Sequence, residues 1–312
     1  MAFTAILTSG SHAHISVSGI PSPTHRRRHA TKTLALPDLP LAANLSADSQ
    51  AAIVVLGGAA VAATLSLTDP ERRRKQQAQE IGGDDKEVVR EYFNNVGFDR
   101  WKKIYGEETE GVNRVQLDIR VGHSKTVENT IAMLKGGGPL SGVTVCDAGC
   151  GTGSLAIPLA LEGAIVYAAD ISAAMVEEAR RQAEEAIAGA EGVTMPEFRV
   201  RDLENLEGKY HTVVCLDVLI HYPQEKAEGM ISHLASLAEN RLVLSFAPKT
   251  FYYNLLKRLG ELFPGPSKAT RAYLHAERDV ERALEKVGWR VRRRGFITTQ
   301  FYFANLVEAV PF

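Results

Sequence analysis

The chain has 312 residues, of which 45% are hydrophobic and 23% charged, so it can bury a full core and suits one large α/β domain with additional segments. Its formal net charge is −1, so no overall attraction to nucleic acid or anionic lipid is implied, and we expect no nucleic-acid partner. The three cysteines, Cys146, Cys150 and Cys215, are too few for a disulfide scaffold and indicate a reducing compartment.

Residues 1–68 are expected to be a leader. The stretch before about residue 41 is rich in Ser, Thr, Ala and His, contains Arg26, Arg27 and Arg28, and has no acid before Asp38. This composition is typical of an organelle transit peptide, although a merely disordered terminus is the alternative. The uncharged run 51–67 is at the short limit for spanning a bilayer. We favour its removal with the leader, and a role in membrane association of the mature protein stays open.

Residues 69–135 are expected to form a linker and a helical arm. An amphipathic helix starts at Asp84 and is broken at Gly97, and a short helix over 99–105 follows. After a polar loop over 106–114, a third helix is predicted from about Ser124 to Lys135, where three glycines and Pro139 end it.

The stretch 143–161 predicts a strand, a tight glycine turn and the start of a helix. An apolar run ends in Asp147, is followed by Gly149, Gly151 and Gly153, and enters an Ala/Leu-rich segment. Glycines let a ligand approach the backbone, and a helix N-terminus favours a negatively charged group. A second apolar strand ends in Asp170, where a carboxylate can accept hydrogen bonds from both hydroxyls of a ribose.

Further strands alternate with helices along the rest of the chain. Strands are predicted at 197–202, 210–217 and 241–246, with helices at 173–189 and 277–287, and an antiparallel pair at 289–298 and 301–310. This order predicts an α/β Rossmann-like fold with a seven-stranded, mostly parallel sheet and an antiparallel edge pair over residues 136–312. The apolar connection 248–275 is expected to be a helical lid, with Tyr252 and Tyr253 contacting the substrate, or else to pack on the sheet.

The motif D-x-G-x-G-x-G from Asp147 to Gly153 resembles the first motif of class I S-adenosylmethionine-dependent methyltransferases. Ser154 stands where a dinucleotide fingerprint needs glycine, which disfavours a nicotinamide reductase. The resemblance implies S-adenosylmethionine as methyl donor. It places the methionine end over the glycine loop, the ribose at the second strand end and the adenine at the third. The implied cofactor-binding residues are Asp147, Gly149, Cys150, Gly151, Gly153, Asp170, Ile171, Asp202, Leu203 and Asp217.

The loop after the fourth strand, which includes His221 and Tyr222, begins beside the donor's sulfonium in this reading. We expect His221 to be catalytic and Tyr222 to contact the acceptor. In the arm, Arg120 and His123 are candidates for the donor's carboxylate.

Two tyrosines of the arm, Tyr92 and Tyr105, are candidates to close the methyl-transfer cavity, Tyr105 with a catalytic role and Tyr92 with an acceptor-binding one. For each of these arm residues, packing is the simpler alternative.

Three stretches together narrow the resemblance. Residues 92–106, 115–123 and 147–155 are similar to the magnesium-protoporphyrin IX O-methyltransferase family of chlorophyll biosynthesis, and the likeness extends over roughly 84–312. It implies methyl transfer to one propionate carboxyl of magnesium-protoporphyrin IX. With the transit-like leader it also implies a chloroplast enzyme on envelope and thylakoid membranes, in contact with magnesium chelatase.

The chemistry needs no protein-bound metal, because the magnesium arrives inside the substrate. A carboxylate is already ionised at neutral pH, so His221 is needed only to orient it and to accept a proton if burial raises its pKa. Two alternatives stay open: a methyltransferase for a phenol or quinone precursor, and a non-catalytic S-adenosylmethionine-binding regulator. Redox control through Cys150 is a further hypothesis.

Overall fold

The computed structural model describes residues 85–106, 110–249 and 273–312, all within one compact unit that spans residues 58–312. The predicted leader 1–68, most of the predicted lid, and Tyr252 and Tyr253 lie outside the described residues. Within the described part, no helix combines the length and the apolar character needed to cross a bilayer.

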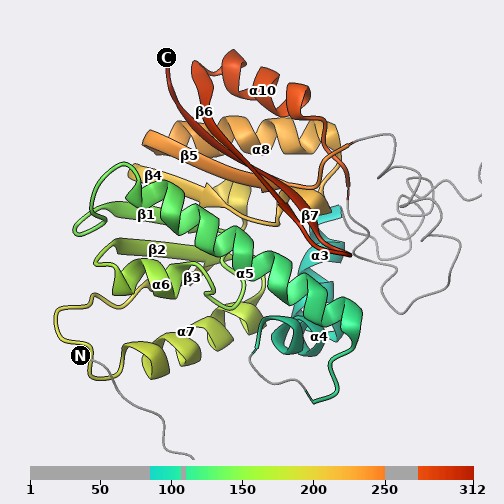
Figure 1. Cartoon of the computed structure of the whole chain (residues 1–312), viewed down its shortest axis with the longest axis vertical. Helices are drawn as coiled ribbons and strands as arrows, with labels where there is room; N and C mark the ends of the chain where they lie inside the picture. Colours follow the sequence, from blue (N-terminus) through green and yellow to red (C-terminus); the bar gives the residue numbers. More distant parts are fainter. Residues whose placement is uncertain (1–84, 107–109, 250–272) are drawn as a thin grey trace, which may run out of the picture. The chain divides into compact units, whose positions relative to one another are not determined.

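The predicted seven-stranded sheet is confirmed, with the order β3-β2-β1-β4-β5-β7-β6. The first five strands are parallel: β1 (Thr144–Ala148), β2 (Ile165–Asp170), β3 (Glu197–Val200), β4 (Tyr210–Cys215) and β5 (Ala238–Phe246). The last two, β6 (Trp289–Thr298) and β7 (Phe303–Pro311), form an antiparallel pair, and β7 also runs antiparallel to β5. Parallel neighbours require crossover connections, which the helices supply (Figure 1).

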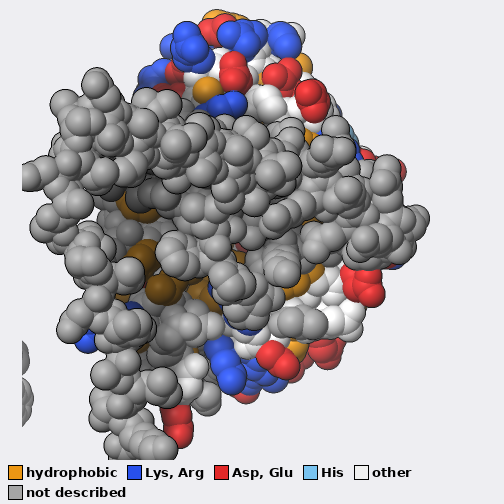
Figure 2. Space-filling model, turned by 90° about the vertical axis from the view of Figure 1, so that its right-hand side faces the viewer, with side chains coloured by type: hydrophobic (Ala, Val, Ile, Leu, Met, Phe, Trp, Pro, Cys, Tyr) orange, Lys and Arg blue, Asp and Glu red, His pale blue; other side chains and the backbone are white. Residues whose placement is uncertain are grey.

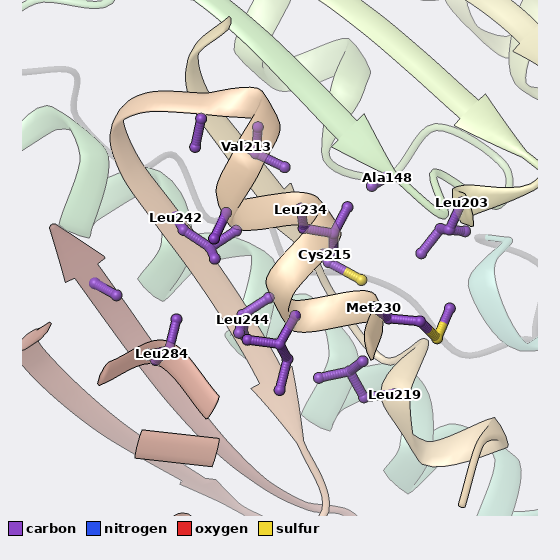
Figure 3. Close-up of a cluster of buried hydrophobic side chains, with 14 of the residues drawn as sticks. Ala148, Leu203, Val213, Cys215, Leu219, Met230, Leu234, Leu242, Leu244 and Leu284 are labelled. Carbon is purple, nitrogen blue, oxygen red and sulfur yellow. The ribbon is translucent and has the colours of Figure 1, made fainter. Parts of the chain in front are cut away.

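Helices cover both faces of the sheet. On one face lie α5 (Arg114–Lys135), α6 (Ala156–Leu161) and α7 (Ala173–Ile187), and on the other α8 (Gln224–Leu237) and α10 (Glu277–Lys286). Successive strand residues point to opposite faces, so Val145 packs with the first helix group and Cys146 with the second. Figure 3 shows the hydrophobic core between the sheet and α8 and α10, where Leu234 of α8 lies against side chains of β4 and β5.

The arm consists of α3 (Asp85–Asn94), α4 (Val96–Tyr105) and the N-terminal part of α5. Two predicted boundaries were wrong. The break falls at Asn95, and Gly97 lies inside α4, where a Cβ would come within 2.4 Å of the Tyr92 ring. The third helix begins at Arg114 and not near residue 124, because Asn113 and Gln116 form a capping box.

Other boundaries differ by a few residues. The glycine turn extends through Leu155, so α6 begins at Ala156. The third and fourth strands end before their acids, and Asp202 instead caps the short 3₁₀ helix η1 (Leu203–Asn205). A second 3₁₀ helix, η2 (Leu219–His221), follows β4.

Candidate active site

A cavity of about 820 Å³ opens at the carboxyl ends of β1, β2 and β4 and is lined by 30 described residues. This is the edge of a parallel sheet where ligands are expected, and the volume is within the range of small-molecule sites. The glycine loop, α3, α4 and the β6–β7 turn all contribute residues to the lining of the cavity. Figure 2 shows one face of the molecule, where hydrophobic side chains are visible between groups of charged ones.

The glycine loop is tied to the end of β2 by its own backbone. The N–H groups of Gly149 and Cys150 donate to the Ala169 carbonyl at 2.7 and 3.0 Å, and that of Gly151 donates to Asp170 Oδ2 at 3.0 Å. Gly149 has φ of +86°, and a Cβ there would lie 2.2 Å from Val218 Cγ2. Gly151 has φ of +52° with open space where a Cβ would stand. The loop is therefore a rigid cradle that a ligand can approach closely.

Two acids flank this cradle. Asp147 is 2% exposed, and its Oδ2 has no hydrogen-bond partner among the described residues. Burial, with a contribution from Asp170, raises the pKa of Asp147 to about 7. Burial also raises the pKa of Asp170. The hydrogen bonds that Asp170 accepts from the backbone N–H of Ser172, at 2.8 Å, and from that of Gly151 lower the pKa but do not offset the effect of burial. A positively charged ligand here would favour the ionised form of both acids. The site therefore fits a nucleoside that carries a sulfonium group.

Of the two residues predicted to contact the adenine, Leu203 is among the described lining residues of the cavity and Asp202 is not. Leu203 is 4% exposed and lines the cavity next to the second strand end, as does Ile171. Asp202 is absent from the described lining; its Oδ1 accepts the Glu204 N–H at 3.0 Å, and its Oδ2 pairs with Lys86 of the arm at 2.9 Å. The described contacts of Asp202 thus hold η1 and α3 together.

Asp217 is the centre of a hydrogen-bond network at the end of β4. Its carboxylate contacts His123 Nδ1 at 2.8 Å, the Tyr302 hydroxyl at 2.8 and 2.9 Å, and the Ser245 hydroxyl at 2.9 Å. Burial alone would raise the pKa of Asp217, but these contacts lower it. His123 Nε2 continues the network to Ser154 Oγ at 2.8 Å. The arm, the glycine loop and the edge strand β7 are therefore joined through one carboxylate.

Asp217 also has a left-handed backbone, with φ of +57°. Such a conformation costs free energy in a residue other than glycine, and it persists where the surroundings fix it. Here the Asp217 N–H donates to Ser245 Oγ at 2.7 Å. The strain sits at the point where β4 turns into the loop that carries His221.

Aromatic rings of α3 and α4 form a wall of the cavity, which we call the aromatic wall: Phe93, Trp101 and Tyr105. Tyr105 stacks on His123 with ring centroids 4.4 Å apart, and Phe93 meets the His221 ring edge-on at 5.3 Å. Burial, followed by the charge of Asp217, raises the pKa of Tyr105, so its hydroxyl stays protonated.

The remaining predicted residues lie as follows. His221 is 9% exposed and lines the cavity, and Tyr222 is 2% exposed and also reaches it. Tyr92 packs edge-on against Phe93 and is not among the described lining residues. Arg120 donates to the carbonyls of Lys103 and Ile104 at 2.6 and 2.8 Å, which fixes α5 to the end of α4. Cys150 lines the cavity, but burial raises its pKa, which disfavours the reactive thiolate.

The turn between β6 and β7 is a part of the site that the sequence reasoning missed. Its residues Gln300, Phe301 and Tyr302 line the cavity. Asp118 of α5 holds the turn by accepting the Thr299 hydroxyl at 2.5 Å and the Phe301 N–H at 2.6 Å. No local signal marks this turn, because the contacts join residues about 180 positions apart.

Among the described residues, no cluster of His, Cys, Asp and Glu could hold a metal ion. The substrate-bound magnesium of the predicted reaction needs no such cluster.

Comparisons with known proteins agree with this geometry. A family model described as the C-terminus of magnesium-protoporphyrin IX methyltransferase matches residues 215–311, and a methyltransferase domain model matches residues 145–240.

The chain is 62% identical over 291 residues to the chloroplastic magnesium protoporphyrin IX methyltransferase of Arabidopsis thaliana, covering 92% of this chain and 90% of the relative. It is 56% identical over 227 residues to the magnesium-protoporphyrin O-methyltransferase of Synechocystis sp. PCC 6803, covering 73% of this chain and 96% of the relative. A crystal structure of magnesium protoporphyrin IX methyltransferase from Synechocystis PCC 6803 with bound SAH matches with a TM-score of 0.66 and 54% identity, over 73% of this chain and all of that one. The chain therefore belongs to the magnesium-protoporphyrin IX methyltransferase family.

Proposed function

We propose that this protein transfers a methyl group from S-adenosylmethionine to one propionate carboxyl of magnesium-protoporphyrin IX and so forms the monomethyl ester. The observation that carries the proposal is one cavity lined both by a glycine cradle with Asp147 and Asp170 and by an aromatic wall. The relatives whose names state this activity match most of the chain, and the arm that carries the wall lies in the matched span.

The donor half of the cavity has the groups that such a donor needs. Bound there, S-adenosylmethionine supplies an electrophilic methyl group on a cationic sulfur. Gly151, with open space where a Cβ would stand, leaves room for its methionine end, and Asp170 is positioned to accept hydrogen bonds from its ribose hydroxyls. Leu203 and Ile171 offer an apolar surface to the adenine. Asp217 is already saturated by three side chains, so we assign it to positioning His123 and Ser154.

The acceptor half positions a nucleophile that is already formed at neutral pH. A carboxyl group has a pKa of about 4–5 in water, and burial in the apolar cavity raises that value. We assign His221 to orienting the propionate and to accepting its proton when one is present. Tyr105, held protonated by burial, can donate a hydrogen bond to the carboxylate. Most of the acceleration would come from alignment of oxygen, methyl carbon and sulfur.

The chloroplast is the compartment we assign, because the leader has a transit-like composition and the Arabidopsis relative is named chloroplastic. Association with envelope and thylakoid membranes and contact with magnesium chelatase are finer parts of the same proposal. Fractionation of plastids with an antibody to this chain, and co-purification with chelatase subunits, test them. Recovery only in the stroma would contradict the membrane assignment.

The test of the activity uses purified protein and a donor with a labelled methyl group. We expect label in magnesium-protoporphyrin as a base-labile ester and none in a catechol. Label in the catechol alone would favour the phenol-methylating alternative. Donor binding without transfer to either acceptor would favour a non-catalytic regulator.

A further inference from the structure

Two neighbouring residues of α4 that line the cavity each have a buried hydrogen-bond donor with no acceptor among the described residues. Arg100 and Trp101 both line it. The Nε of Arg100 and the Nε1 of Trp101 are buried, and neither has a hydrogen-bond partner among the described residues. Most buried N–H groups are paired, since an unpaired one loses its water without compensation. Two such groups on adjacent residues that line one cavity indicate that this part of the lining is built for a ligand acceptor.

The charge distribution indicates what that acceptor is. Arg100 is the only lysine or arginine among the described lining residues, whereas Asp147, Asp170 and Asp217 are acids of the glycine-loop side. No ion pair of Arg100 is found in the described part of the chain. A guanidinium offers two parallel donors that match a carboxylate, and it remains charged at any physiological pH.

The position of the pair indicates the acceptor half. The Trp101 ring lies 5.3 Å from that of Tyr105 and 6.1 Å from that of Phe93. Those two rings in turn contact His123 and His221. Trp101 is thus part of the aromatic wall, whose other two rings contact His123 and His221, and Arg100 precedes it on the arm and lines the same cavity.

We propose that Arg100 and Trp101 form a subsite for the second, non-reacting propionate carboxylate of the acceptor. This inference rests on the proposed function. Protoporphyrin carries two propionates on one edge of the macrocycle, so when one enters the cavity the other is brought in beside it. An ionised carboxylate inside an apolar cavity needs a partner, and the Arg100 guanidinium with the Trp101 indole N–H supplies one.

The subsite has a consequence for the product. The monomethyl ester has one carboxylate left. To methylate it, the protein would have to place the neutral ester against Arg100 and leave the guanidinium unpaired. A site built for a charged group rejects an analogue that lacks the charge, because its own polar groups then lose their partner. Arg100 is accordingly a specificity-determining residue that limits the reaction to one ester.

The experiment compares wild type with Arg100→Gln, Arg100→Lys and the matched control Lys103→Gln, an exposed residue of the same helix that is not among the described lining. Acceptors are magnesium-protoporphyrin and its analogue with the non-reacting propionate capped as a methyl amide. We expect Arg100→Gln to raise the KM for the diacid about 10- to 100-fold, with kcat and the Kd for S-adenosylmethionine within about 2-fold. Arg100→Lys should recover part of the loss, and Lys103→Gln should behave as wild type.

The capped acceptor separates binding from a structural effect. Wild type should use it about 10- to 100-fold less well than the diacid, while Arg100→Gln should use both equally. An unchanged KM in Arg100→Gln, a weakened donor Kd, or a fall in kcat at constant KM would each overturn the subsite. If wild type transfers no methyl group to magnesium-protoporphyrin, the proposed function fails; if it does and discrimination persists in Arg100→Gln, only the subsite fails.

Discussion

The contact between α5 and the β6–β7 turn predicts that a glycine-to-alanine substitution in α5 will destabilise the protein, although alanine has the higher helix propensity. Gly122 of α5 lies under the Tyr302 ring, and a Cβ there would come within 2.3 Å of two ring carbons. Tyr302 has little freedom to move, because its hydroxyl bonds both carboxylate oxygens of Asp217 and lies 2.8 Å from Thr126 Oγ1. Gly122→Ala must therefore displace the ring or bend the helix.

The magnitude follows from three effects. Replacing glycine by alanine inside a helix gains about 1 kcal/mol. Overpacking costs about 1–3 kcal/mol, and losing the hydrogen bond between Tyr302 and an ionised carboxylate costs about 1.5–3 kcal/mol. The net expectation is a loss of about 1.5–5 kcal/mol in the free energy of unfolding.

Urea unfolding of Gly122→Ala and the control Gly229→Ala measures this difference. Gly229 lies inside α8, is exposed, and has no atom within 4 Å of a built Cβ, so its replacement should stabilise by up to about 1 kcal/mol. In a Tyr302→Ala background the penalty at position 122 should largely disappear. Equal stabilisation by the two alanines would refute the reasoning.

Three further predictions address the site. Asp170→Asn should weaken binding of S-adenosylmethionine at least about 10-fold in calorimetry, since a charged acceptor for the ribose is lost; an unchanged Kd would exclude the ribose role. Burial raises the pKa of Asp147 to about 7, and a cationic donor favours the ionised form of Asp147. Donor binding should therefore release protons, and the affinity should increase from about pH 5 to pH 8. Calorimetry in buffers of different ionisation enthalpy measures the proton release, and a pH-independent Kd without release would contradict the prediction. Asp118→Ala should raise the KM for the porphyrin with little change in donor Kd, because the turn carrying Phe301 loses two hydrogen-bond acceptors; parallel loss of donor binding would show a general structural defect instead.

The protein without ligand should also respond to pH through its two cavity acids. Burial raises the pKa of Asp147 and Asp170 above the unfolded value, so the folded state binds more protons than the unfolded state above about pH 4. These two groups therefore reduce the free energy of unfolding as the pH rises towards 7. Asp147→Asn should flatten this part of the stability curve, measured by urea unfolding; a steeper curve would contradict the assignment.

The sheet and the geometry of the glycine cradle could be predicted because their signals are local. An apolar strand, an acid and the glycines from Gly149 to Gly153 are neighbours in sequence, and their spacing fixes the cradle. The strand order of a doubly wound sheet places Asp170 beside them. The mostly parallel sheet and its antiparallel edge pair are confirmed on the same basis.

The network around Asp217 could not be predicted, because its members come from five separate parts of the chain. Asp217 was expected to bind the donor, and His123 to reach the donor's carboxylate. The structure shows them hydrogen-bonded to each other in the lining of the cavity, with Tyr302 and Ser245 also bonded to Asp217, and their contacts with the donor stay a prediction. Tyr302 gives no signal in sequence, since its importance arises only when the β6–β7 turn packs on α5. The start of α5 was missed because a capping asparagine inside a polar segment resembles an ordinary loop.

The most direct test is a crystal structure of this protein with SAH. We expect the ribose hydroxyls on Asp170, the adenine against Leu203 and the sulfur facing the aromatic wall. SAH bound away from the Gly149–Gly153 loop, or with its sulfur turned from Tyr105 and His221, would contradict the assignment of this cavity to methyl transfer.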